Sequence, residues 1–251
     1  MPKFNTENDE QFKIPGASNF NFSGTRIDTL GETGVDEYTL VTIGIDVSGS
    51  VTPFKDDLLE MLKNIISVCQ NHPTSERIMV RVLTFNQNLY EIHGYKEINE
   101  INIDDYDDFK CSGMTALYDS TFSAIGATVT YAENLINNNF DANGDIYIIT
   151  DGCDNISKMT PKSIKDKKNQ SIIDEKIESI RMFLIGIDYG GDSYIKKYLE
   201  EFKNEASFTD YIDVGSANPS NLGKLANYIS KSISAQSQSL GTGGPSQALT
   251  F

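Results

Sequence analysis

The chain has 251 residues and a formal net charge of −15, with 39% hydrophobic and 23% charged residues. This length and composition suffice for a folded domain with a sizeable core. The negative charge disfavours direct contact with nucleic acid or an anionic membrane surface, because their phosphates would be repelled. The N-terminal residues lack the apolar core of a signal peptide, and no run is long enough to span a bilayer, so we expect a cytoplasmic protein.

Residues 1–37 are polar, with scattered phenylalanines and no helical period. We expect an extended, irregular N-terminal arm that places some of these phenylalanines on the following domain. The phenylalanines are Phe4, Phe12, Phe20 and Phe22.

A regular pattern begins at Tyr38 and continues to residue 95. Residues 38–45 form an apolar, β-branched run that is typical of a strand buried on both faces. Apolar residues at i, i+3 and i+4 predict an amphipathic helix over 54–69. Residues 78–85 predict another strand, and 88–95 a shorter strand that pairs with it after a tight turn.

The second half of the chain continues the alternation. Helices are expected over 115–136, 171–180, 193–205 and 219–236, and strands over 145–152, 181–188 and 211–214. The polar, Lys-rich residues 153–170 suggest a long loop. The Ser-, Gln- and Gly-rich residues 237–251 suggest a flexible tail.

Alternating apolar strands and amphipathic helices predict an α/β fold. We expect a Rossmann-like three-layer α/β/α sandwich, with a mostly parallel central sheet and one antiparallel edge strand. The domain covers residues 38–236.

Oxygen-bearing side chains gather where the predicted parallel strands end. Asp46, Ser48 and Ser50 follow the first strand, Asp151 lies at the end of the strand over 145–152, and Thr115 lies where a loop enters a helix. Ligands of open α/β sheets bind outside the carboxyl ends of the strands, so we expect these five residues on one edge of the sheet.

These side chains suit a hard divalent cation. Carboxylate and hydroxyl oxygens are the donors that Mg²⁺ prefers, and the cation keeps some water ligands. The spacing of two lets Asp46, Ser48 and Ser50 point the same way, while Gly49 permits a tight turn. Two carboxylates neutralise the charge, and the neutral hydroxyls leave the cation able to accept one more oxygen.

Other interpretations stay open for single residues. Asp46 and Asp151 could each cap the turn that follows. Asp154 and Asn155 are expected to hold a turn rather than to bind metal, and Asp119 to favour a helix N-terminus. The odd number of cysteines, without C-x-x-C spacing, favours reduced thiols; they are Cys69, Cys111 and Cys153.

The three motifs Asp-Val-Ser-Gly-Ser at 46–50, Thr115 in SGMTALYD and Asp151 in ITDG resemble the metal-ion-dependent adhesion site of von Willebrand factor type A domains. The likeness spans residues 38–236 and is closer to bacterial and phage intracellular domains than to the integrin inserts. It implies that Ser48, Ser50 and Thr115 give hydroxyls to Mg²⁺, or to another divalent cation such as Mn²⁺ or Ca²⁺. Asp46 and Asp151 would bind directly or through water.

The resemblance implies a protein-binding module, in which a Glu or Asp of a partner protein completes the metal site. It also suggests a MoxR-type AAA+ ATPase as a partner, and possible movement of the last helix on binding. No nucleophile with an activating base, and no glycine-rich cofactor loop, points to an enzyme. The alternative is a structural or assembly protein, for example of a phage particle, that uses its arm and tail for contacts; it would then be virion-associated.

Overall fold

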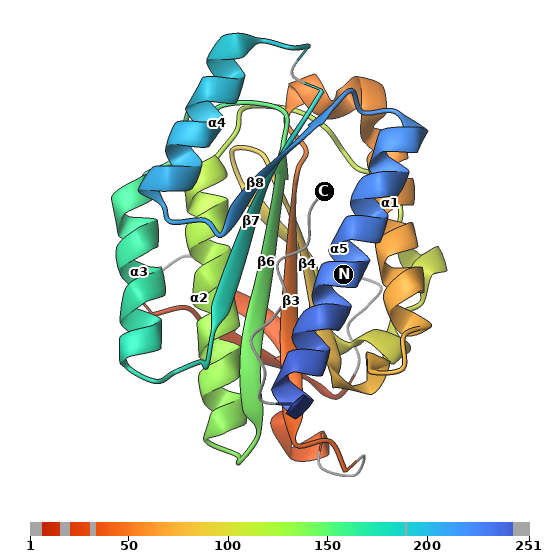
Figure 1. The fold of residues 1–251 in the computed structure, drawn as a ribbon, viewed down its shortest axis with the longest axis vertical. Coiled ribbons are helices and arrows are strands. Elements are labelled where there is room, and N and C mark those ends of the chain that lie inside the picture. The colour runs from red at the N-terminus through yellow and green to blue at the C-terminus, as the bar shows by residue number, and fades with distance from the viewer. Residues whose placement is uncertain (1–6, 16–20, 31–33, 189, 243–251) are drawn as a thin grey trace.

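The computed structural model describes residues 7–15, 21–30, 34–188 and 190–242. The strands within these residues form one sheet in the order β1-β2-β5-β4-β3-β6-β7-β8 (Figure 1). The strands are β1 Asp9–Lys13, β2 Asn21–Thr25, β3 Glu37–Asp46, β4 Ile78–Phe85, β5 Leu89–Glu97, β6 Asp141–Thr150, β7 Ile180–Ile187 and β8 Asp210–Gly215.

The central strands confirm the predicted α/β class. β4, β3, β6, β7 and β8 run parallel, and β5 pairs antiparallel with β4. Every residue of β3 and β4 is buried, which explains why both strands are continuous apolar runs rather than alternating ones.

Helices cover both faces of the sheet (Figure 1). α1 and α5 pack together on one face, and α2, α3 and α4 lie on the other. The side chains of β6 and β7 alternate between the two resulting cores, with Ile149 and Ile185 in one and Ile148 and Leu184 in the other. The helices are α1 Lys55–Gln70, α2 Leu117–Ile136, α3 Pro161–Ile173, α4 Ser193–Glu205 and α5 Pro219–Thr242.

The N-terminal arm is more regular than its sequence suggests. β1 and β2 form an antiparallel ribbon, and β2 lies beside β5, with Gly24 opposite Tyr95. Phe12 and Phe22 are buried in the core beneath α2, as expected of arm phenylalanines. Phe4 and Phe20 lie outside the described residues.

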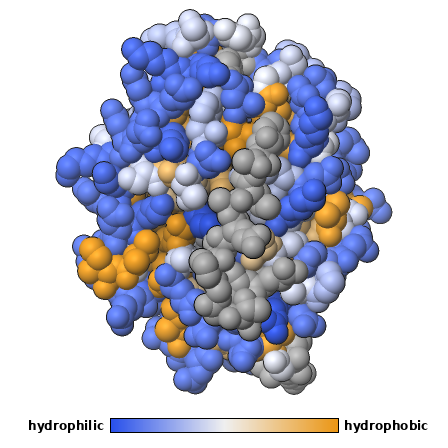
Figure 2. Space-filling view, in the orientation of Figure 1, coloured by the Kyte–Doolittle hydropathy of each residue, from blue (hydrophilic) through white to orange (hydrophobic). Residues whose placement is uncertain are grey.

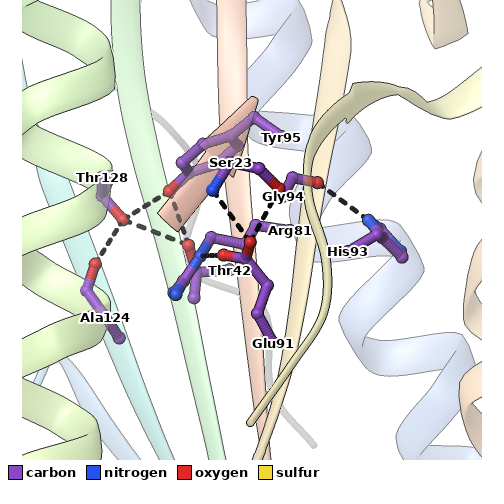
Figure 3. A network of polar contacts seen from close by, with 9 residues as sticks. All are labelled: Ser23, Thr42, Arg81, Glu91, His93, Gly94, Tyr95, Ala124 and Thr128. Carbon is purple, nitrogen blue, oxygen red and sulfur yellow. Dashed lines mark hydrogen bonds and ion pairs between the residues drawn. The ribbon is translucent and has the colours of Figure 1, made fainter. Parts of the chain in front are cut away.

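A buried polar network fixes this ribbon to the sheet (Figure 3). The backbone N–H and the hydroxyl of Ser23 donate to Glu91 at 2.8 and 2.7 Å, and Glu91 accepts from Arg81 at 2.8 Å. Lys96 and Asp9 form a second ion pair at 2.8 Å, with both side chains buried. Because charges this deep are costly unless paired, the ribbon and the sheet depend on each other.

The prediction of a loop over 153–170 and a helix over 171–180 is wrong in its boundaries. The structure places α3 at Pro161–Ile173. Thr160 caps this helix by accepting from the Ser163 N–H, with Pro161 in the first turn. Within α3 only Ile164 and Ser171 are buried, so the sequence carries almost no apolar stripe to reveal a helix.

The last helix continues past residue 236, to Thr242. The remainder of the predicted tail, residues 243–251, lies outside the described residues. No helix in the described part of the chain is both long and apolar enough to cross a membrane. Figure 2 shows a mostly hydrophilic surface over the visible face, with apolar residues in separate patches.

Candidate metal centre at the carboxyl edge of the sheet

The carboxyl ends of β3 and β6, which lead into predicted site residues, lie at the upper edge of the sheet in Figure 1. β3 and β6 are adjacent parallel strands, with Ile45 opposite Ile149. Asp46 ends β3 and Asp151 follows β6, so both carboxylates emerge at the same edge. Asp46, Ser48, Thr115 and Asp151 are buried, whereas Ser50 is exposed.

Both carboxylate oxygens of Asp46 accept hydrogen bonds. Oδ1 accepts from the Ser48 N–H at 2.8 Å, and Oδ2 from the Thr150 hydroxyl at 2.7 Å. These bonds fix the carboxylate against the start of the loop. Asp46 therefore orients the start of the loop that carries Ser48, and its carboxylate is suited to binding a cation through a water molecule.

The buried Ser48 and Asp151 lie next to the exposed Ser50. The hydroxyls of Ser48 and Ser50 lie 3.1 Å apart. Ser50 lies close enough to Asp151 to favour the charged form of its carboxyl. The buried Oδ1 of Asp151, however, has no hydrogen-bond partner among the residues that the structure describes. A buried oxygen without a partner is costly, so this atom is suited to an additional ligand.

Thr115 is joined to this group through the backbone. Its N–H donates to Asn155 Oδ1 at 2.9 Å, and its carbonyl accepts from the Asn155 N–H at 3.1 Å. The loop before Thr115 is also joined to the loop after β3. The Ser112 N–H donates to the Val47 carbonyl, and the Gly49 N–H donates to the Gly113 carbonyl. Three loops are thus tied together around the five predicted residues.

Asn86 is a positioning residue that the sequence interpretation missed. Its side-chain N–H donates to the Ser112 carbonyl at 2.9 Å, and its own carbonyl accepts from the Ala116 N–H at 2.8 Å. It therefore brackets the loop that carries Thr115. The available signal was an asparagine directly after β4, at the edge where the other polar residues gather.

Asp154 and Asp119 hold the loop after β6 against α2. Asp154 Oδ1 accepts from the Tyr118 N–H at 3.2 Å and also bonds the Ser157 hydroxyl. Asp119 Oδ1 accepts from the N–H groups of Lys158 and Met159. Asp154 therefore has the turn-holding role expected of it, while Asp119 ties the loop as well as lying in the first turn of the helix.

Burial disfavours the charged forms of the Asp46 and Asp151 carboxylates. Burial, followed by a smaller repulsion from Asp151, raises the pKa of Asp46 to about 6 despite its hydrogen bonds. Burial also raises the pKa of Asp151, and Asp188 adds a repulsion. A positive charge between them would relieve both effects.

Hydroxyls are essential to this candidate site. No group of three or more His, Cys, Asp and Glu in the described part of the chain is arranged to bind a metal. All three cysteines are free, as predicted; Cys69 is buried, and Cys111 and Cys153 are partly exposed. Any cation here would have two carboxylates and neutral oxygens, which is a donor set suited to hard divalent ions.

No protein-family model and no curated protein matches the sequence. Solved structures do match. The PilB minor pilin from Streptococcus sanguinis has a TM-score of 0.56 at 15% identity, over 84% of this chain and 64% of the pilin. The pilus adhesin SpaC from Lactobacillus rhamnosus GG in its open conformation has a TM-score of 0.54 at 12% identity, over 93% of this chain and 36% of the adhesin.

A third match is proximal thread matrix protein 1 from the mussel byssus, in a structure described as having a zinc-occupied MIDAS motif, the metal-ion-dependent adhesion site. Its TM-score is 0.50 at 16% identity, over 80% of this chain and 46% of the matrix protein. The chain thus spans less than two thirds of each of these three proteins. At such identities the likeness shows the fold alone, an α/β sandwich around a mostly parallel sheet.

Proposed function

We propose that this chain is a protein-binding module that depends on a divalent cation, with Mg²⁺ as the first candidate. Ser48, Ser50, Thr115, Asp46 and Asp151 hold the cation. The single observation that carries the proposal is the buried, unpartnered Oδ1 of Asp151 beside two hydroxyls and a second buried carboxylate. The matrix protein with zinc at its MIDAS motif supports the choice of a divalent cation.

When bound, the cation supplies an electrophilic position that takes a carboxylate oxygen from a partner protein. The chain's own residues prepare that position. Asp46 is fixed by the Ser48 N–H and Thr150, and Asn155 and Asn86 fix the loop of Thr115. Preorganised donors of this kind lower the ordering cost of binding.

No catalytic role is part of the proposal. The hydroxyls of Ser48 and Ser50 lie 3.1 Å apart, and neither forms a hydrogen bond with a histidine or a lysine among the residues that the structure describes. Both histidines are engaged elsewhere, His93 with Tyr106 and Gly94, and His72 with Thr74. Hydrolysis of p-nitrophenyl phosphate that disappears in Asp46→Asn would contradict this part of the proposal.

The test is affinity capture from a cell lysate, with the immobilised chain in Mg²⁺ or in EDTA, followed by mass spectrometry. We expect a partner that is retained only in Mg²⁺. Thr115→Ala removes one hydroxyl and should lose the partner, while the matched control Thr115→Ser keeps the hydroxyl and should retain it. A partner captured equally in EDTA and by Thr115→Ala would refute a metal-bridged contact. A MoxR-type AAA+ ATPase is one partner to look for.

Assembly is the second candidate function, favoured by the names of two structural neighbours, a minor pilin and a pilus adhesin. In this case the metal would brace the loops, and contacts would lie elsewhere. The arm is already engaged within the sheet through Phe12 and Phe22, which leaves the segment 243–251 to test. Capture that survives EDTA but is lost on deleting 243–251 would favour assembly.

A further inference from the structure

Exposed apolar side chains gather beside the candidate metal centre. The large apolar side chains that are most exposed in the described part of the chain are Val68, Tyr90, Met114, Ile156, Ile172, Ile173 and Tyr194. Met114, Ile156 and Tyr194 belong to segments that follow the carboxyl edge of the sheet, and 48%, 40% and 70% of their surfaces are exposed. We name these three residues the rim apolar surface.

Met114 and Ile156 are spatial neighbours although they are distant in the sequence. Each is next in the chain to one member of the Thr115–Asn155 pair, which is joined by two hydrogen bonds of 2.9 and 3.1 Å. Thr115 is itself a proposed metal ligand. The backbone at Met114 and at Ile156 therefore lies beside a proposed metal ligand.

Tyr194 extends the same surface from α4. It lies one turn before Tyr198, so both side chains project from one face of the helix. The Tyr198 hydroxyl accepts from the Asp154 N–H at 3.1 Å, which places that face of α4 against the loop after β6. Tyr194 lies in the first turn of α4, next to Asp192, which caps the helix.

The loop that presents Met114 is held rigidly. The Met114 N–H donates to Gln87 Oε1 at 3.0 Å, and Gly113 adopts a φ of +78°, which favours glycine. The backbone thus fixes an apolar side chain in solvent beside a proposed metal ligand. Exposed apolar groups around a buried polar centre are typical of an interaction surface.

The surrounding charge is acidic. Asp188 and Asp192 are exposed on the loop before α4, and Asp188 contributes to the raised pKa of Asp151. A partner segment that carries only negative charge would be repelled here, and so would a second copy of a chain with net charge −15. Lysine or arginine in the partner would offset this field.

We propose that the rim apolar surface selects the partner: the site binds a segment of another protein in which a Glu or Asp is flanked by apolar and basic side chains. The inference rests on the proposed function, because the carboxylate is the group that reaches the cation. The apolar flank packs on Met114, Ile156 and Tyr194, and the basic flank faces Asp188 and Asp192.

The experiment is selection of a random peptide display library against the immobilised full chain in Mg²⁺. Enriched peptides are then synthesised, and their affinities are measured for the wild type and for variants. We expect sequences with an acidic residue, an apolar residue and a Lys or Arg within about four positions of one another. Met114→Ser, Ile156→Ser and Tyr194→Ser should each weaken binding by about tenfold, the loss expected for one buried apolar contact.

Matched controls separate this inference from the proposed function. Ile173→Ser changes an exposed apolar residue at the far end of α3, and should bind as the wild type does. Mn²⁺ titration by calorimetry should be unchanged in Met114→Ser and lost in Asp46→Asn. If Asp46→Asn loses the peptides and the three rim variants do not, the proposed function stands and this inference fails.

If peptide binding survives Asp46→Asn and EDTA, the proposed function fails and the inference fails with it. A selection that returns no sequence, or acidic sequences without an apolar or a basic neighbour, also overturns the inference.

Discussion

At the scale of single residues, two glycines with a backbone conformation that disfavours other residues allow the geometry of the site to be tested. Gly113 and Gly190 both have positive φ, +78° and +62°. A Cβ on Gly190 would meet nothing within 4 Å, whereas one on Gly113 would lie 1.7 Å from Gln87 Oε1. Gln87 would then have to move away from the Met114 N–H.

Alanine at either glycine should therefore cost about 1 kcal/mol of stability through backbone strain. Only Gly113→Ala should also weaken Mn²⁺ binding, measured by calorimetry, because the loop of Thr115 shifts with Gln87. Equal Mn²⁺ affinities in the two variants would show that this loop does not position a ligand.

His93 makes the stability of the fold depend on pH. Burial lowers its pKa from 6.5 to about 4, and nearby Lys96 and Arg81 act in the same direction. The unfolded chain therefore binds the proton first, so the contribution of His93 to stability falls as the pH falls from about 6.5 to about 4. Asp46, whose pKa is raised to about 6, contributes with the opposite sign over part of this window. The full shift corresponds to about 3 kcal/mol.

Urea unfolding at a series of pH values between 4 and 7 measures this effect. His93→Gln removes the titrating group, so lowering the pH through that window should cost this variant less stability than it costs the wild type. His72→Gln, just after α1, is the matched control and should keep the wild-type pH dependence. A wild-type slope that persists in His93→Gln would assign the dependence to other groups.

At the scale of elements, the ribbon of β1 and β2 is attached through a close backbone contact. A Cβ on Gly94 would lie 1.7 Å from the Ser23 carbonyl oxygen, and a backbone atom cannot turn away as a side chain can. Gly94→Ala should therefore displace β2 from β5 and cost about 2–3 kcal/mol, in the range of overpacked cores.

Urea unfolding and limited proteolysis check this prediction together. Cleavage within residues 7–30 should become faster in Gly94→Ala than in the wild type. Gly152→Ala is the control, because a Cβ there would meet nothing within 4 Å. Unchanged cleavage in Gly94→Ala would mean that the ribbon tolerates the contact.

The same elements show what the sequence could and could not predict. β3 and β4 were predictable because strands buried on both faces carry continuous apolar runs. β2 was not, because NFSGT has no clear alternation and its partner β5 lies about 70 residues away. α3 was missed because its exposed, Lys-rich surface has no apolar stripe.

For the site, the sequence predicted which side chains share the carboxyl edge but not what holds them. Strand order follows from general rules, so Asp46 and Asp151 could be placed together. The tie between Asn155 and Thr115 joins residues forty positions apart, and the bonds of Asn86 join it to a loop far along the chain. Such contacts depend on loop conformation, which no local pattern encodes.

At the scale of the whole molecule, a cation that binds only the folded chain must stabilise the entire fold. Binding adds RT ln(1 + [L]/Kd) to the free energy of unfolding, or about 2.7 kcal/mol at a metal concentration of 100 times Kd. For a chain of this size each kcal/mol raises Tm by about 2–4 °C, so Mg²⁺ should raise Tm by about 5–10 °C.

Thermal unfolding in EDTA and over a series of Mg²⁺ and Mn²⁺ concentrations measures this linkage. The wild-type Tm should rise with the logarithm of the metal concentration once the site begins to fill. Asp46→Asn should remove the rise and, because it no longer places a second charge beside Asp151, should not be less stable than the wild type in EDTA. A rise of equal size in Asp46→Asn would place the stabilising cation elsewhere on this strongly acidic chain. A wild-type Tm that does not respond to any divalent cation would leave Asp46 and Asp151 as capping residues of two loops.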